Sequence, residues 1–561
     1  MKRYLLLISV IFSGLVLKVG LLTLDVFPFN SDEAIVGLMA RHILMGERPI
    51  FFYGQAYMGS LDAFLVAGFF SVFGQSVSGI RLVQVILYLF TIMTGFWVGS
   101  QFFYSFRAGL ITALFLAIPP VNTTLYTTVS LGGYGEALLI GNLILIATGY
   151  LLRKSENCLD RTNPREEIGE RKDHKSKQGF IVFPLMEIDL SVLLWLLWGF
   201  LCGFGLWVNG LTLVYSVPAG FMILFRLFRC KNLSLITRSS TLMLGGLVIG
   251  SLPWWIFAFQ NGLSSLIQEL FGAAVAVESE PFLLRSLNHI LYFVILGLPA
   301  AIGLRPPWDV FWLGLPLLPL ILLLWGKIVW DWFKTSRLPE YRLIEGVALT
   351  LFLGYVFTSF GVDPSGRYFL PVWVTMSLIG GKVLDDWGKK KPALLGLVGL
   401  VSLYNLWGNL QCASSNPPGL TTQFYPPARV DMRHLPEVIE FLRETGEIRG
   451  YSNYWVAYPM AFLTNEEIIF SPRLPYHPDL RYTRRDDRYP IYTKVVDQSN
   501  KVALITTRNP ALDEKLQNFL QERRILWNEK QIGDFIIYYN LSEPIQIVDL
   551  EKLFIPSDAI Q

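Results

Sequence analysis

The sequence predicts a mainly α-helical polytopic membrane protein of about eleven transmembrane helices, followed by a small α/β extracytoplasmic domain. The chain has 561 residues, of which 52% are hydrophobic and only 16% charged, which is too apolar for a soluble protein of this length. Long apolar runs recur up to residue 411, and after residue 412 the composition becomes that of a water-soluble domain. We therefore expect a membrane domain over 1–411 and a separate domain over 412–561.

The first apolar run sets the orientation of the chain. Lys2 and Arg3 precede an apolar stretch over 4–24, which is longer than the core of a signal peptide and lacks a small-x-small cleavage site. We expect a retained transmembrane helix in the cell (inner) membrane, with the N-terminus in the cytoplasm. The loop over 25–79 then lies outside, and its apolar segment 61–73 is too short to span the membrane, which favours a helix lying along the interface.

The remaining spans follow from apolar runs and from the positions of lysine and arginine. The strongly charged segment 153–189 is predicted to be a cytoplasmic loop. Segment 287–304 is ambiguous, but as a second interfacial helix it keeps the later basic cluster in the cytoplasm and leaves the C-terminal domain outside. The expected spans are 80–103, 108–121, 137–152, 190–208, 211–228, 240–258, 309–330, 343–360, 368–387 and 393–411.

The C-terminal region has the pattern of a small α/β domain behind a proline-rich linker. Amphipathic periodicity predicts helices at 435–446 and 510–524, and short apolar runs predict strands at 501–507 and 534–541. The formal net charge of the whole chain is only +3, so nothing in its composition indicates a nucleic-acid partner.

A polar and aromatic stretch over 29–60 stands out in the first loop. Asn30 is a good N-cap and Glu33 follows three residues later, so a short helix should begin here and end at Gly46. Asp32 and Glu33 lie in its first turn, where the helix dipole stabilises a carboxylate. They are either capping residues or catalytic acids, and this loop alone leaves both interpretations open. The predicted buried face carries Ala34, Ile35, Leu38 and Met39.

Two further groups of polar residues are predicted at the outer ends of spans, where a charge is costly unless it is paired or used. Glu136 follows a run of glycines that would allow a ligand close to the backbone, although it would also suit the first turn of a helix. Arg367 and Tyr368 begin another span, at the depth of a lipid phosphate that an arginine binds well. The alternative for Arg367 is an ion pair with Asp363 at the interface.

Taken together, these motifs resemble the GT-C membrane glycosyltransferases. The resemblance rests on the acidic pair in NSDEAIVGLMARHIL, on GGYGE before the fourth span, on the RYFLP turn and on the expected extracytoplasmic C-terminal domain. It is strongest to the protein mannosyltransferase and aminoarabinose transferase-like group, which is family 39-like. As architecture it covers the membrane domain, whereas specific motif matching is concentrated in the first loop.

The resemblance implies transfer of a sugar from a polyprenyl-phosphate donor to a lipid, glycan or protein acceptor at the outer face, with inversion of the anomeric carbon. By position, Asp32 would be the general base, with Glu33 as a second catalytic acid. Arg367 would hold the lipid phosphate, with Tyr368 as its neighbour. No cofactor follows with certainty from the resemblance; a divalent metal ion, if one binds, would be held by Asp32 and Glu136. The remaining residues expected to contact substrate are Glu136, Gln55 and Tyr57.

Other functions remain as alternatives. An oligosaccharyltransferase or polymerase-type GT-C enzyme would show the same distribution of charges. A lipid or sugar transporter would be expected to have broken helices and charged residues near the middle of the membrane. Here the charged residues cluster at the predicted outer ends of spans. A non-catalytic membrane scaffold would tolerate changes at Asp32, Glu136 and Arg367.

Overall fold

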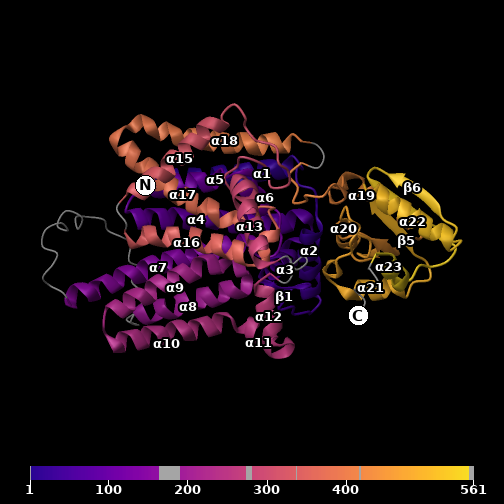
Figure 1. Cartoon of the computed structure of the whole chain (residues 1–561), viewed down its shortest axis with the longest axis horizontal. Helices are drawn as coiled ribbons and strands as arrows, with labels where there is room; N and C mark the ends of the chain where they lie inside the picture. The colour runs from indigo at the N-terminus through magenta and orange to yellow at the C-terminus, as the bar shows by residue number, and fades with distance from the viewer. Residues whose placement is uncertain (1, 163–189, 273–280, 336–337, 416–418, 555–561) are drawn as a thin grey trace.

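The structure is a computed structural model that describes residues 2–162, 190–272, 281–335, 338–415 and 419–554. A long bundle of helices carries a C-terminal α/β domain at one end (Figure 1). We call the end of the bundle next to this domain the domain-facing end. The predicted fold class is therefore confirmed, whereas most of the predicted cytoplasmic loop at 153–189 lies outside the described residues.

A helix lies over every predicted span. These helices are α1 (Lys2–Thr23), α4 (Val77–Phe103), α5 (Phe106–Ala117), α7 (Tyr134–Thr162), α8 (Leu190–Val208), α9 (Leu213–Arg229), α10 (Leu233–Gly250), α15 (Leu318–Lys334), α16 (Pro339–Phe357), α17 (Leu370–Lys390) and α18 (Gly396–Ala413). Within the described ranges, seven helical segments are long and apolar enough to cross a membrane. These seven segments are Arg3–Thr23, Val77–Phe103, Tyr134–Arg153, Gly210–Arg229, Leu233–Gly250, Phe282–Ala301 and Pro392–Ala413. The exact number of membrane crossings stays a prediction.

The segment Phe282–Ala301 is long enough to span, but its contacts favour a helix along the surface. It consists of α13 (Phe282–Leu291), a π-helical turn η3 (Tyr292–Gly297) and α14 (Leu298–Ala301). Near its start, the His289 ring lies 2.9 Å from the carbonyl oxygen of Val356, at the end of α16. At its other end, α14 packs against α6 (Val121–Tyr126), the short helix that follows α5. Both ends therefore lie at the domain-facing end.

Glycines bring α8 and α10 into close contact. Each helix carries a glycine pair four residues apart, Gly199 and Gly203 in α8 and Gly246 and Gly250 in α10. A side chain at any of these positions would clash with a backbone carbonyl oxygen of the other helix. Small residues at this spacing allow the backbones of membrane helices to approach closely, so this pair depends on van der Waals packing.

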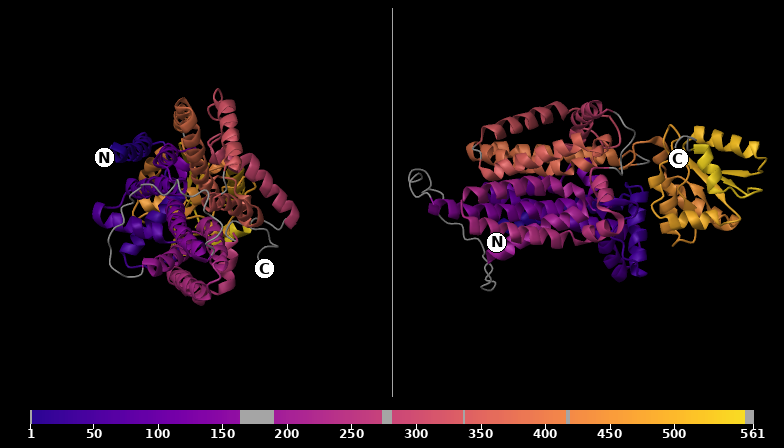
Figure 2. Two further views of the ribbon diagram at one scale, coloured as in Figure 1. Left: turned by 90° about the vertical axis from the view of Figure 1, so that its left-hand side faces the viewer. Right: turned by 60° about the horizontal axis from the view of Figure 1, so that its bottom comes forward.

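The first loop folds into α2 (Ser31–Leu44), a hairpin of β1 (Phe51–Phe52) and β2 (Gln55–Gly59), and α3 (Leu61–Phe73). Its indigo ribbon lies at the domain-facing end, between the bundle and the C-terminal domain (Figure 2). The predicted helix and its cap are confirmed, because the Asn30 side chain accepts a hydrogen bond from the Glu33 backbone at 3.1 Å. All side chains from Ala34 to Ile43 are buried, not one face alone, because α20 of the C-terminal domain covers the face expected to be exposed.

The C-terminal domain is built on a five-stranded sheet in the order β4-β3-β5-β7-β6. Strands β4, β3 and β5 are parallel, and β7 and β6 are antiparallel additions. The predicted strands at 501–507 and 534–541 are β5 and β7, and the predicted helices are α19 and α22. The elements are α19 (Leu435–Thr445), β3 (Arg449–Ser452), α20 (Tyr454–Leu463), β4 (Ile469–Ser471), α21 (Pro490–Asp497), β5 (Ala503–Thr507), α22 (Pro510–Glu522), β6 (Asn528–Ile532), β7 (Phe535–Tyr539) and α23 (Ile547–Phe554).

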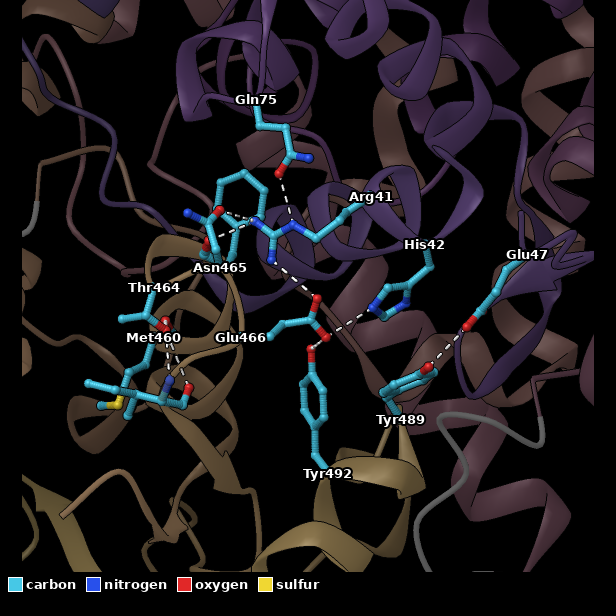
Figure 3. Close-up of polar contacts among 12 residues, drawn as sticks. Arg41, His42, Glu47, Gln75, Met460, Thr464, Asn465, Glu466, Tyr489 and Tyr492 are labelled. Atoms are coloured by element: carbon cyan, nitrogen blue, oxygen red, sulfur yellow. Dashed lines mark hydrogen bonds and ion pairs between the residues drawn. The ribbon is translucent and has the colours of Figure 1, made fainter. Parts of the chain in front are cut away.

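A polar network docks this domain onto α2 (Figure 3). The Glu466 carboxylate lies 3.0 Å from His42 Nε2 and 3.4 Å from an Arg41 nitrogen, and it accepts a 2.7 Å hydrogen bond from Tyr492. Arg41 also donates to the side-chain oxygen of Asn465 at 3.0 Å. Arg41 and His42 are buried, so these bonds are shielded from solvent and hold the two domains in a defined orientation.

We predict that Gly246→Leu separates α8 from α10, whereas Gly245→Leu leaves the bundle intact. The first substitution forces a side chain into the backbone of α8, whereas nothing lies within 4 Å of a Cβ at Gly245. Overpacking of this kind costs about 1–3 kcal/mol or more. Thermal unfolding of the purified variants in detergent measures the difference, and equal melting temperatures would contradict the packing described here.

We also predict that docking of the C-terminal domain weakens in acid. Burial by itself would raise the pKa of Glu466, but hydrogen bonds from His42 and Tyr492 and the charges of His42 and Arg41 lower this pKa to about 2. The folded pKa thus lies below the ordinary value of 4.5 for a glutamate, so the stabilisation is complete above that value and is lost as the pH falls through about 2. Hydrogen exchange of α2 between pH 5 and 2 should show the loss, and Glu466→Gln should remove its pH dependence.

Candidate active site

Asp32 lies at the junction between the bundle and the C-terminal domain. It is in the first turn of α2, as predicted, and its Oδ1 accepts a 2.5 Å hydrogen bond from the hydroxyl of Tyr454, the first residue of α20. The neighbouring Ser31 donates a 2.5 Å hydrogen bond to the carbonyl oxygen of Tyr454. The acid is half-buried and has a partner from a segment far away in the sequence.

Glu33 is turned away from this junction, because successive residues of a helix point in different directions. Its carboxylate is fully buried and receives two hydrogen bonds of 2.9 Å from the guanidinium of Arg81, on α4. Arg81 also donates to the carbonyl oxygen of Phe27 at 3.1 Å. Glu33 therefore anchors α2 to the bundle, and both of its oxygens are occupied by that ion pair.

Glu136 lies in a second buried cluster on the same face of α4. The side-chain nitrogen of Gln84 donates to Asp62 at 2.9 Å and to Glu136 at 3.3 Å, so it links the two carboxyl groups. Ser130 donates a short hydrogen bond to the other oxygen of Asp62. This cluster ties α3, α4, α7 and the loop before α7 together beneath the first loop.

The predicted pair of metal ligands does not fit this arrangement. Asp32 is bonded to Tyr454, whereas Glu136 belongs to the cluster around Gln84. Among the described residues, no group of three or more His, Cys, Asp or Glu side chains is arranged to hold a metal ion. Metal ions bound by carboxylates need several oxygen ligands converging on one point, so we derive no step through a metal.

Arg367 and Tyr368 lie in a tight turn at the domain-facing end. Gly366 has a φ of 96°, and a side chain there would clash with Asn122, which donates to the Gly366 carbonyl oxygen at 3.1 Å. The turn directs the Arg367 guanidinium over the Tyr368 ring, 5.3 Å from its centroid, and into a short ion pair with Asp363. The Arg367 Nε is buried and has no hydrogen-bond partner, so the ion pair leaves donor capacity unused.

Tyrosines connect these groups. The Tyr126 hydroxyl donates to the carbonyl oxygen of Ser365, two residues before Arg367, at 3.0 Å. Tyr57, which was predicted to bind substrate, is buried, and its ring centroid lies 5.3 Å from that of Phe360, which lies 5.0 Å from that of Tyr368. Tyr57 thus belongs to one aromatic cluster with Tyr368, over which the Arg367 guanidinium lies.

The C-terminal domain contributes Arg488, which was not predicted. The Arg488 guanidinium lies 5.6 Å from the centroid of the Tyr454 ring and donates to the Gly54 carbonyl oxygen at 3.3 Å. With its amide turned to satisfy both of its ends, Gln55 accepts from Arg488 at 2.6 and 2.9 Å. Burial raises the pKa of the nearby Asp486 to about 7, the charge of Arg488 opposes this rise, and that of Asp32 adds to it. The basic run TRRDDRY was the only sequence signal for these residues.

Comparison with known proteins was made at the level of sequence and of structure. No protein-family model matches the sequence, and no curated protein sequence is significantly similar to it. Two crystal structures of ArnT from Cupriavidus metallidurans share the fold. The apo structure has a TM-score of 0.56 at 12% identity, with 95% of this chain and 97% of that chain covered. The structure bound to undecaprenyl phosphate has a TM-score of 0.52 at 13% identity, with coverage of 95% and 98%.

The similarity extends over nearly the full length of both proteins, so it includes the bundle and the C-terminal domain. At this level of identity it concerns the fold and not the substrates. ArnT, the aminoarabinose transferase, is a GT-C membrane glycosyltransferase. The predicted resemblance is therefore confirmed for the fold: this chain has the fold of ArnT.

Proposed function

We propose that this protein is an inverting glycosyltransferase that moves a sugar from a polyprenyl-phosphate-linked donor to an acceptor at the outer face of the membrane. The observation that carries the proposal is the presence of a carboxylate and a cation at the domain-facing end, connected through the first-loop hairpin. Arg488 lies over Tyr454, the hydrogen-bond partner of Asp32, and it contacts Gln55 of β2. Tyr57 of the same strand packs on Phe360, next to the Tyr368 ring below Arg367. Asp32 and Arg367 are the two charged groups that displacement of a lipid phosphate requires.

The proposed orientation puts the domain-facing end outside the membrane. At the opposite end, Arg107 pairs with Asp385, and Lys389 lies 2.8 Å from the same carboxylate. Arg3 stands over the ring of Phe106 at a distance of 5.9 Å, so the N-terminus is at that end as well. Because lysine and arginine are enriched in cytoplasmic loops, this concentration of basic residues supports a cytoplasmic N-terminus and an extracytoplasmic C-terminal domain.

In the proposed reaction, the oxygen of an acceptor hydroxyl attacks the anomeric carbon while the bond from that carbon to the phosphate oxygen breaks. Asp32 takes the proton of the hydroxyl, and the electron pair of the broken bond leaves with the lipid phosphate. Arg367, whose Nε has no hydrogen-bond partner in the part of the chain that the structure describes, stabilises the charge on the leaving phosphate. Attack opposite to the leaving group inverts the anomeric carbon.

The choice of a polyprenyl-phosphate donor is supported by the fold and by the position of Arg367 along the bundle. One of the ArnT structures with the same fold is bound to undecaprenyl phosphate. Arg367 precedes α17 directly, so its guanidinium lies at the end of a bundle helix, where a lipid headgroup would lie. Tyr57 interacts electrostatically with Arg367, and Gln55 accepts hydrogen bonds from Arg488. These interactions favour contacts of Tyr57 and Gln55 with the sugar or acceptor.

Within this proposal the other predicted acids have supporting roles. Glu33 holds α2 in place through Arg81, and Glu136 supports the loop before α7 through Gln84 and Asp62. Both oxygens of Glu33 are engaged by Arg81, whereas Oε2 of Glu136 has no hydrogen-bond partner among the described residues, so Glu136 stays a candidate for contact with the sugar or acceptor.

We predict opposite effects for substitutions of the two adjacent acids. Asp32→Asn should lower the rate of sugar transfer by a factor of about 10² to 10⁴, because it removes the general base. The protein should stay folded, because asparagine has nearly the same shape as aspartate. Glu33→Ala leaves Arg81 buried without its carboxylate, which costs about 3–5 kcal/mol and should lower the melting temperature. Transfer from labelled polyprenyl-phosphate sugars and thermal unfolding measure both effects. Full transfer by Asp32→Asn would contradict the assignment of the base.

We further predict that Arg367→Ala weakens donor binding and lowers kcat by about a hundredfold, because one charged donor to the leaving phosphate is lost. The matched control is Lys327→Ala, which breaks another ion pair of the same i,i+4 spacing, remote from the site. Donor binding and turnover are measured at equal expression. A donor panel that includes lipid-linked oligosaccharides tests the oligosaccharyltransferase alternative, and wild-type protein that transfers from no donor would favour a transporter.

A further inference from the structure

We propose that Tyr454 of the C-terminal domain is a positioning residue for Asp32, so that the active site is complete only when this domain is docked on the bundle. The inference rests on the proposed function, because it assigns to Tyr454 the orientation of the catalytic base. It gives the C-terminal domain a part in the chemistry, beyond covering the first loop.

The hydrogen bond has the geometry that such a role requires. Tyr454 is 2% exposed, and its hydroxyl donates to Asp32 Oδ1 at 2.5 Å. A phenol has one proton to give, and hydrogen bonds to a carboxylate are short and strong. With Oδ1 held in this way, the carboxylate cannot rotate freely, and Oδ2 is left to accept the proton of the acceptor.

Both partners of this bond are themselves fixed. Ser31, the residue before Asp32, binds the backbone carbonyl of Tyr454 at 2.5 Å, so the two segments are joined twice. Asn453 caps α20 by accepting from the backbone of Trp455 at 2.9 Å. The Arg488 guanidinium covers the Tyr454 ring. The tyrosine therefore presents its hydroxyl in one orientation, as preorganisation of a catalytic group demands.

The titratable groups that interact electrostatically with Asp32 come mainly from the same domain. They are Tyr454, Tyr476, Asp486 and Arg488 from the C-terminal domain and Tyr126 from the bundle.

A purely structural role for Tyr454 is separable from this one. Docking of the domain is also maintained by the network of Arg41, His42, Glu466 and Tyr492, which lies further along α2. Tyr454→Phe removes one oxygen atom and keeps the buried ring. The docked arrangement should therefore survive the substitution, and a fall in kcat at unchanged donor KM would report on the bond to Asp32.

The test compares Tyr454→Phe with Tyr538→Phe in the full-length protein. Tyr538 is the matched control, because its buried hydroxyl also donates to a carboxylate of the same domain, that of Asp513 at 3.1 Å. Transfer from a labelled polyprenyl-phosphate sugar is measured as kcat and donor KM. For Tyr454→Phe we expect kcat to fall roughly tenfold to a hundredfold and donor KM to stay unchanged.

Other outcomes overturn the inference in distinguishable ways. Wild-type kcat in Tyr454→Phe, with an inactive Asp32→Asn, would leave the proposed function standing and remove the role of Tyr454. A loss of activity in Tyr454→Phe together with new protease cleavage between the domains would mean that Tyr454 only docks the domain. An active Asp32→Asn would overturn the proposed base and, with it, this inference.

Discussion

The buried ion pair between Glu33 and Arg81 is the interaction on which the geometry of the site depends. It fixes the start of α2 against α4 inside the protein, where a charge without a partner would be costly. With Glu33 held on one side, the neighbouring Asp32 is directed to the other side, toward the C-terminal domain. An acidic pair that looks symmetrical in the sequence thus divides into a buried anchor and a half-buried carboxylate at the domain junction.

The C-terminal domain meets this carboxylate through the carboxyl end of a parallel strand. Strand β3 ends at Ser452, and the chain passes through Asn453 directly into Tyr454 at the start of α20. Loops at the carboxyl ends of parallel strands are the usual location of functional residues in α/β folds, because side chains from several segments converge there. Here that edge faces the membrane domain, so two domains together form one site.

Two distinct kinds of polar cluster surround the site. The pair of Glu33 and Arg81 is buried and satisfied within the bundle, and it holds the first loop. Among the described residues, the cluster of Glu136 and the turn at Arg367 keep unused capacity, in Oε2 of Glu136 and in the Nε of Arg367. Satisfied polar networks stiffen a fold, whereas incompletely satisfied groups at a domain junction are the ones available to a ligand.

Local pattern in the sequence determined the fold class, a helix over each expected span, the capped helix at Asn30 and the strands at 501–507 and 534–541, because periodicity and capping act over a few neighbouring residues. Strands β3 and β4 have only four and three residues, and β6, with the polar and mostly exposed sequence NEKQI, lacks an apolar run, so none of them gives such a signal. The sequence also picked out Asp32 and Arg367, but their relation to Tyr454, Arg488 and Tyr126 arises from segments hundreds of residues apart. Only the tertiary structure decided that Glu33 is an anchor and Asp32 is not, since the difference lies in which buried partner each carboxylate meets.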